Sequence, residues 1–332
     1  MKGGKRWLAI TLVIVAGVLV AGWIGTLKSS NDARALLELL PPDADAYAVL
    51  DLDILQSNPA VKRLLADPPN VPPTEEYQEM LRQSGFRYQD DLRQLAVAKV
   101  GQDWVGAAIV DVEQQRFIRY LESQGAQETE LNGRTVYSFG SERPFRLVFL
   151  DNRTVAFTIG ADPAYLPAYL PAYLKDVLDR RASPSGLSAK DDLTNAGLLA
   201  RYAEGSGLWV VGRIDRLAAG GTAVPGIGPF QLGSDWWEGS ETILVSVVSS
   251  TLHLDVHLEN QCESAASAER MAAAFNALLV ILKAVQPPES DSNKTNYTPL
   301  LAAITILQAD KSVLVDWKWD PSMLALLAGG SR

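Results

Sequence analysis

The chain of 332 residues has one cysteine, Cys262, and two histidines, His253 and His257. A single cysteine excludes an internal disulfide bond, and so few histidines give little support to a Ser-His or Cys-His nucleophilic site. The sequence also lacks a phosphate loop ending in Lys-Ser/Thr, a GxGxxG loop after a strand, HExxH and GxSxG. We therefore expect no cofactor, and the signatures of nucleotide-binding enzymes, zinc proteases and serine hydrolases are missing.

The first 31 residues contain no acidic residue, and the first acidic residue is Asp32. Because Lys2, Lys5 and Arg6 lie at the start of the chain, the remainder after Arg6 carries 27 basic and 39 acidic side chains, a net charge of −12. A body this acidic repels nucleic acid and anionic lipid headgroups. We expect no nucleic-acid partner.

The segment from Trp7 to Leu27 is apolar and contains no charge. As a helix it is about 30 Å long, which matches the hydrocarbon core of a bilayer. The apolar region of a signal peptide has only about 7–15 residues, so the length favours an uncleaved transmembrane anchor, with a cleaved signal peptide as the alternative. The basic residues before it place the N-terminus in the cytoplasm. We expect a single-pass protein of a bacterial cytoplasmic membrane with an extracytoplasmic C-terminal body, and the lipid bilayer as the partner of this segment.

Gly17, Ala21 and Gly25 recur every four residues and line one side of the predicted anchor. Small residues at this spacing let two membrane helices approach closely, which makes a homodimer through the anchor a hypothesis. The alternative is that glycine and alanine are simply common in membrane-spanning helices.

The predicted fold is α+β: an N-terminal transmembrane helix followed by two α/β lobes with mainly antiparallel sheets. We divide the chain into a cytoplasmic stub and anchor (1–28), a first lobe (29–160), a junction (161–190) and a second lobe (191–332). Alternating strands and turn signals such as Asn132-Gly133 indicate antiparallel pairing. The junction contains three copies of Pro-Ala-Tyr-Leu, a helix and a linker. The copies are either a tandem duplication in an exposed loop or a tyrosine-lined ligand surface.

The two predicted lobes share a loose plan. A strand at residues 46–53 leads into Asp53-Ile54-Leu55, much as a strand at 208–214 leads into Asp215-Arg216-Leu217. Residues 149–155 and 306–313 are also faintly alike, so a distant internal duplication is an open alternative. Towards the C-terminus we predict a long alanine-rich helix at 265–285, a short helix at 299–307 and a strand at 312–319.

Four metal-ligand types alternate with apolar residues on one predicted strand: His253, Asp255, His257 and Glu259. On a strand all four point to one face, and metal sites use these residue types. The two histidines would lie roughly 13 Å apart, too far to share one ion without other elements. A solvated polar sheet face is the alternative interpretation.

Two further groups are weaker candidates. Asp51 and Asp53 close a predicted strand, where carboxylates either act in catalysis or cap the following turn, and we favour capping. Trp236, Trp237, Trp317 and Trp319 are candidate ligand-binding residues because stacked tryptophans bind sugars, although large aromatics mostly fill cores.

The first predicted lobe contains several short runs that belong together as a pattern: Pro42–Tyr47, Gly85-Phe86, Asp90–Leu92, Phe117–Leu121 and Leu150–Val155. These runs resemble a group of uncharacterised, N-terminally anchored bacterial exported proteins that share a domain of unknown function. The resemblance covers mainly residues 42–160 and implies a fold and a location. It brings no catalytic residues, and the Pro-Ala-Tyr-Leu copies depart from the pattern.

From these features we predict a membrane-anchored extracytoplasmic protein, a non-catalytic binding or scaffolding module of the cell envelope with an envelope protein as partner. One alternative is a metal-dependent hydrolase using His253, Asp255 and His257. Another is a small-molecule receptor with an interlobe cleft lined by Trp236 and Trp237.

Overall fold

The structure is a computed structural model. It describes residues 33–59, 61–62, 75–140, 144–160, 177–178, 188–201, 205–219, 237–284, 286, 298–320 and 323. The predicted anchor Trp7–Leu27, with Gly17, Ala21 and Gly25, lies outside the described residues. So do Trp236 and most of residues 161–190, including the Pro-Ala-Tyr-Leu copies.

The first half of the chain forms seven strands and several short helices within the described residues. They are η2 (Ala33–Leu39), β1 (Ala46–Asp51), α2 (Leu52–Leu55), α4 (Glu75–Ser84), α5 (Tyr88–Asp91), β2 (Leu92–Val100), β3 (Asp103–Val110), α6 (Gln114–Ser123), β4 (Gln127–Leu131), β5 (Arg134–Phe139), β6 (Phe145–Phe149) and β7 (Thr154–Ile159). The second half begins at α8. It contains α8 (Ala189–Asn195), η3 (Leu199–Arg201), β8 (Ser206–Arg213), α9 (Ile214–Ala219), β9 (Ser240–Ser249), β10 (Leu254–Cys262), α10 (Ala265–Ala284), α11 (Thr298–Ala302), β11 (Ile304–Ala309) and β12 (Ser312–Trp319).

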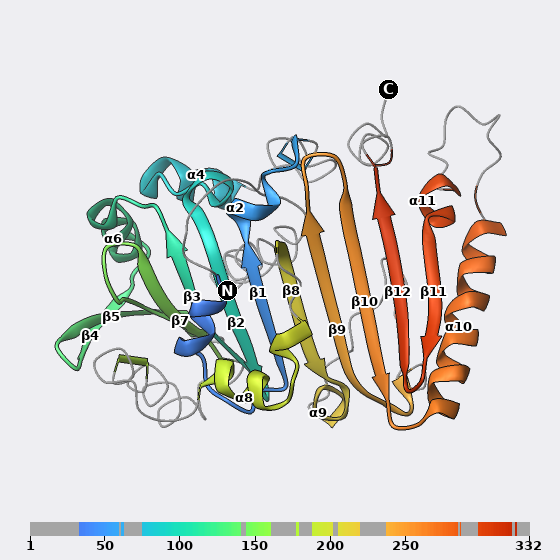
Figure 1. Cartoon of the computed structure of the whole chain (residues 1–332). Coiled ribbons are helices and arrows are strands. Elements are labelled where there is room, and N and C mark those ends of the chain that lie inside the picture. Colours follow the sequence, from blue (N-terminus) through green and yellow to red (C-terminus); the bar gives the residue numbers. More distant parts are fainter. Residues whose placement is uncertain are drawn as a thin grey trace, which may run out of the picture.

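All described strands join in one antiparallel sheet of twelve strands, in the order β11-β12-β10-β9-β8-β1-β2-β3-β7-β6-β5-β4 (Figure 1). The mixed helix and strand composition and the antiparallel pairing agree with the predicted α+β class. Two separate lobes are not confirmed, because β1 pairs with β8 from Ala46↔Gly212 to Leu50↔Leu208. The strands of the two predicted lobes are therefore the two sides of one continuous sheet.

The two sides of the sheet repeat one order of elements. On one side β1, α2, the hairpin β2–β3, α6 and the hairpin β6–β7 follow each other, and β7 pairs back on β3. On the other side β8, α9, the hairpin β9–β10, α10 and the hairpin β11–β12 follow, and β12 pairs back on β10. The first side adds α4, α5 and the hairpin β4–β5. The faintly similar segments 149–155 and 306–313 both fall on the turn of the last hairpin, so this topology supports an internal duplication.

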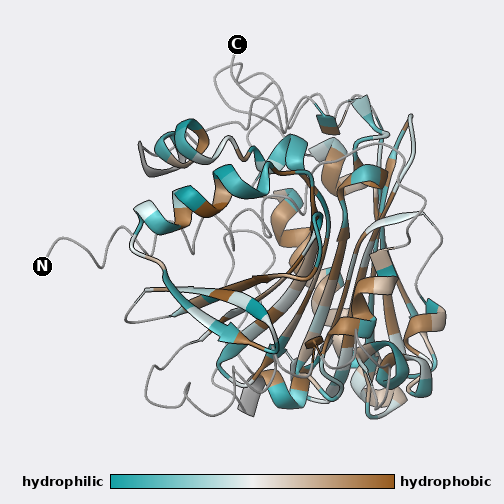
Figure 2. Ribbon diagram, turned by 90° about the vertical axis from the view of Figure 1, so that its left-hand side faces the viewer, coloured by the Kyte–Doolittle hydropathy of each residue, from teal (hydrophilic) through white to brown (hydrophobic). Residues whose placement is uncertain are grey.

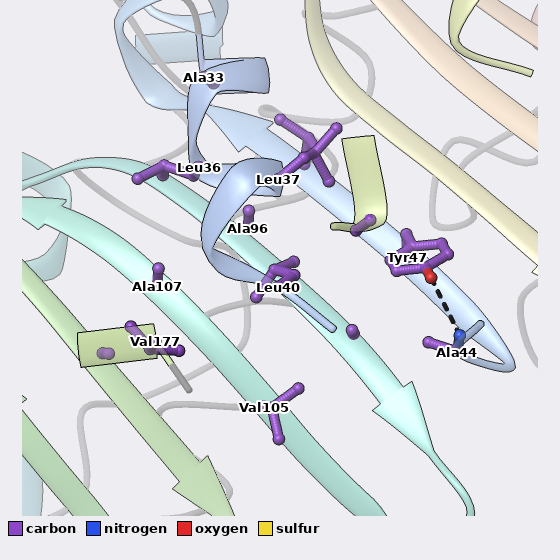
Figure 3. Packing of buried hydrophobic residues seen from close by; sticks show 14 of the residues in the cluster. Ala33, Leu36, Leu37, Leu40, Ala44, Tyr47, Ala96, Val105, Ala107 and Val177 are labelled. Carbon is purple, nitrogen blue, oxygen red and sulfur yellow. Dashed lines mark hydrogen bonds between the residues drawn. The ribbon is translucent and has the colours of Figure 1, made fainter. Parts of the chain in front are cut away.

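One face of the sheet packs against η2 and α8. Leu36, Leu37 and Leu40 lie over the strands (Figure 3). The strand residues that face them are small, such as Ala96 and Ala107. The alanines leave room for the leucines, so the helical layer approaches closely and excludes water. We call this the η2 face.

The opposite face packs against α2, α4 and α6 on one side of the sheet and against α10 on the other. Met80 of α4 and Tyr120 of α6 belong to a cluster with Phe157 of β7, whereas Met271 and Phe275 of α10 lie with Val313 of β12. We call this the α10 face. Figure 2 shows the result: the strands are mostly hydrophobic, and much of the surrounding helices and turns is hydrophilic.

Close packing between the two sides of the sheet requires a glycine in β8. A Cβ atom on Gly207 would lie 2.2 Å from Cγ of Leu55 in α2, closer than real Cβ contacts. The absence of a side chain at this position therefore lets α2, which follows β1, lie against the second half of the chain.

A polar cluster also joins the two halves at the other end of β1. The Arg213 guanidinium donates to both oxygens of the Asp192 carboxylate, at 3.0 and 2.9 Å. The Tyr47 hydroxyl donates to the same carboxylate at 3.0 Å and accepts from the Ala44 N–H. Burial raises the pKa of Tyr47 above its usual value, so the tyrosine stays neutral.

The short helix predicted at residues 299–307 is wrong in its second half. The helix α11 ends at Ala302, and residues from Ile304 onward form β11, which pairs with β12 from Ile304↔Trp317 to Ala309↔Ser312. The β-branched residues Ile304, Thr305 and Ile306 favour a strand, and the hairpin with β12 supplies their hydrogen-bond partners.

Candidate functional site

The four predicted metal ligands lie in one row on the η2 face, at the side of the sheet far from η2. Asp255, His257 and Glu259 alternate along β10 as predicted, while His253 precedes the strand. Among the described residues, no group of three or more metal-ligand side chains gathers around a common point. The structure therefore places these residues in one row but gathers no three of them into a metal site.

Separate neighbours engage these side chains. His257 contacts the Asp316 carboxylate of β12 through Nδ1, directly across the strand pair. His253 contacts Asp255 at 3.1 Å, and Glu259 accepts from Arg201 at 2.7 Å and from Ser312 at 3.0 Å. These contacts divide the row into cross-strand and local polar pairs, as on a solvated sheet face.

Asp51 caps a helix, as favoured from the sequence. It is the N-cap of α2, and its Oδ1 accepts from the Ile54 N–H at 2.9 Å. Its Oδ2 accepts from the Gln94 side chain at 2.8 Å. Burial raises the pKa of this carboxyl to about 6, because the two hydrogen bonds compensate only part of the lost hydration.

Asp53 does not continue the strand, because β1 ends at Asp51 and Asp53 lies in α2. Its carboxylate is 5% exposed and contacts Arg93 at 3.3 Å. Arg93 in turn donates to Asp111 at 2.7 Å, and Asp111 also binds Arg153 at 2.7 Å. This network joins residues up to a hundred positions apart, so no local signal in the sequence marks it.

Three of the four candidate tryptophans lie within the described residues, and all three pack against other side chains. Trp237 is buried and meets Phe275 of α10 edge to face. Trp317 and Trp319 meet each other edge to face at 4.8 Å, and Trp317 donates to the Leu300 carbonyl at 2.7 Å. Core packing accounts for their positions, and a ligand site at these residues stays a prediction.

Helix α10 carries an exposed apolar surface that the sequence reading missed. It runs along the outer edge of the sheet beside β11 (Figure 1). By length and composition it is the one described helix able to span a membrane, yet only 28% of its apolar window is buried. Its buried residues end at Phe275, and Val280 and Ile281 are 67% and 58% exposed. These two adjacent exposed aliphatic side chains make the outer side of α10 a candidate interaction surface.

The helix at the equivalent position of the first half is different. Helix α6 exposes the polar residues Gln115, Arg119 and Glu122. It is also bound to α4, because Arg116 donates to the Gln83 and Arg82 carbonyls at 3.0 and 2.8 Å. The apolar outer surface of α10 is thus a property of that helix and not of its place in the repeated plan.

No protein-family model and no curated protein matches the chain. Three solved structures of a protein named TP0453 do. Crystal form III has a TM-score of 0.49 and 11% identity, form IV 0.46 and 10%, and form I 0.44 and 10%. The matches cover 92%, 90% and 92% of this chain and 100% of the other chain in each case. Similarity at this level establishes neither a shared fold nor a shared function.

Proposed function

We propose that this protein is a non-catalytic binding module of a bacterial cell envelope, held at the outer side of the cytoplasmic membrane by residues Trp7–Leu27. The single observation that carries the binding role is the exposed apolar surface of α10, with Val280 and Ile281. Water contact with such side chains is unfavourable, and a protein partner that covers them gains their transfer free energy. The tether rests on the length and charge pattern of the N-terminal segment.

The polar residues of β10 fit this function better than they fit hydrolysis. A metal hydrolase needs about three ligands on one ion and an open position for water. Here Glu259 is bound to Arg201, and His257 faces Asp316 across the strand pair. These partners give the β10 row a role in holding strands and η3 together.

Fractionation of bacteria that express the full chain tests the tether. The intact chain is expected in the membrane pellet, resistant to high salt and released by detergent, because a spanning helix inserts almost irreversibly. A variant without residues 7–27 is the matched control and should move to the soluble fraction. Recovery of the intact, unprocessed full chain in the soluble fraction without detergent would overturn the proposal.

A further inference from the structure

The outward positions of α10 follow a seven-residue repeat. Its exposed residues at alternating spacings of four and three are Ala266, Arg270, Ala273, Ala277, Val280 and Ala284. This spacing is the seam of a two-helix coiled coil, and alanine at most positions lets a second helix approach closely. Ile281 lies beside the seam and widens its apolar area.

The residues that flank this seam are complementary in charge to the same residues of a second, antiparallel α10. Glu269, Asn276 and Lys283 are exposed and spaced seven residues apart, so they lie on the same side of the seam. If a second α10 runs antiparallel, with a two-fold axis at Asn276, each Glu269 lies beside the Lys283 of the other helix. The same-side flanking positions of antiparallel helices do face each other, so both ion pairs form at once.

We infer that the outer surface of α10 binds α10 of a second copy of this chain, antiparallel and around a two-fold axis at Asn276. The inference rests on the proposed function, since it names the partner of the exposed surface. It concerns a different surface from Gly17, Ala21 and Gly25 of the predicted anchor.

Lipid is the main alternative partner for this surface. The amino-acid composition of the surface favours a second helix over lipid. Interfacial helices insert Trp, Phe and Leu and carry a basic polar face. The seam of α10 consists mostly of alanines, which insert little apolar area into lipid, and Glu269 flanks it. Alanines are instead what two closely packed helices need at their contact.

A single helix pair lies at the small end of specific interfaces, which start at about 1,200 Å². Two tethered chains meet in the plane of one membrane, where their effective concentration is high. The dimer is therefore expected in membranes and at high concentration in detergent, and it should dissociate on dilution.

Cysteine cross-linking of the full chain in membranes locates the contact. In a Cys262→Ser background, Asn276→Cys should form a disulfide-linked dimer, because the two-fold axis brings that position next to itself. The matched control is Arg119→Cys on α6. This position is also exposed, but it belongs to the first half of the sheet, away from α10. Equal cross-linking at both positions would indicate random collision and would overturn the inference.

Charge exchange tests the antiparallel pairing. Glu269→Lys alone and Lys283→Glu alone each place like charges at both contacts, so each should weaken self-association about tenfold or more. A mixture of these two variants restores both ion pairs and should associate at least as well as the unchanged chain. Arg119→Glu on α6 is the control and should leave association unchanged.

Two outcomes would overturn the inference while leaving the tether intact. One is a chain that fractionates with membranes but whose association ignores both charge variants. The other is quenching of a fluorophore on Ile281→Cys by spin-labelled lipid, which would assign the surface to the bilayer.

Discussion

At the scale of single residues, Asp51 stabilises the junction between β1 and α2 through hydrogen bonds, while its burial disfavours the charge on its carboxylate. The carboxylate satisfies the first free N–H groups of α2 and binds Gln94, yet it is only 4% exposed. Capping therefore favours an oxygen acceptor at this position, and burial disfavours its charge.

The substitution Asp51→Asn keeps the cap and removes the charge. Because the pKa rises from 3.8 to about 6 on folding, the folded chain holds this proton more tightly than the unfolded chain. Ionisation of Asp51 thus lowers stability as the pH rises from about 4 to about 6, by about 2–3 kcal/mol in total. We expect the free energy of unfolding of Asp51→Asn, relative to that of the unchanged chain, to rise by this amount between pH 4 and pH 7. Urea unfolding in detergent measures it.

The control for this experiment is Asp51→Ala, which also removes the cap. Its free energy of unfolding should be about 1 kcal/mol lower than that of Asp51→Asn at every pH. A constant difference between Asp51→Asn and the unchanged chain across pH 4–7 would contradict the buried ionisation.

The capping role of Asp51 could be predicted because a cap depends on residues within four positions. The network of Asp53, Arg93, Asp111 and Arg153 could not, since pairing of β2, β3 and β7 brings its members together. For the same reason the row from His253 to Glu259 could be predicted, but its partners Asp316 and Arg201 could not.

At the scale of elements, Gly207 decides how closely α2 and β8 approach. The substitution Gly207→Ala places a Cβ within the Leu55 side chain and 3.1 Å from its backbone nitrogen, so one element must move. Overpacking of this kind costs about 1–3 kcal/mol, which thermal or urea unfolding would measure.

Gly212→Ala in the same strand is the matched control. Its Cβ would lie 3.0 Å from the tip of the Leu217 side chain, which can shift, so the loss should be smaller. Equal losses for both variants would mean that the contact between α2 and β8 is no tighter than its surroundings.

Individual elements were predictable where local chemistry is decisive. Asn132 and Gly133 both have positive φ, 50° and 73°, as the hairpin signal required. The stretch 299–307 was not, because its β-branched residues become a strand only through β12. The helix at 265–285 was correctly predicted, but its exposed surface depends on which neighbours the fold provides.

At the scale of the whole molecule, pairing of β1 with β8 makes one sheet of two similar halves. Sequence patterns could not show this, since both strands read equally well as the edges of separate lobes. The pattern did indicate that the halves are alike, and the repeated order of elements supports that reading.

One sheet predicts one cooperative unit. Amides in β2 and β3 and amides in β9 and β10 should exchange with solvent at the same free energy of opening, because β1 and β8 pair with each other and each would lose a neighbouring strand if the other half unfolded. Native-state hydrogen exchange measures this. Two well-separated opening energies would show that the halves unfold as independent lobes.

The central claim is that a tethered body lies outside the cytoplasmic membrane, and labelling of intact spheroplasts tests it most directly. Leu252 is 68% exposed at the turn between β9 and β10, so Leu252→Cys in a Cys262→Ser background offers a reactive thiol on the body. The account predicts that a membrane-impermeant maleimide labels this cysteine before lysis, and that the labelled chain pellets with membranes. Labelling only after lysis, or label on a soluble intact chain, would contradict it.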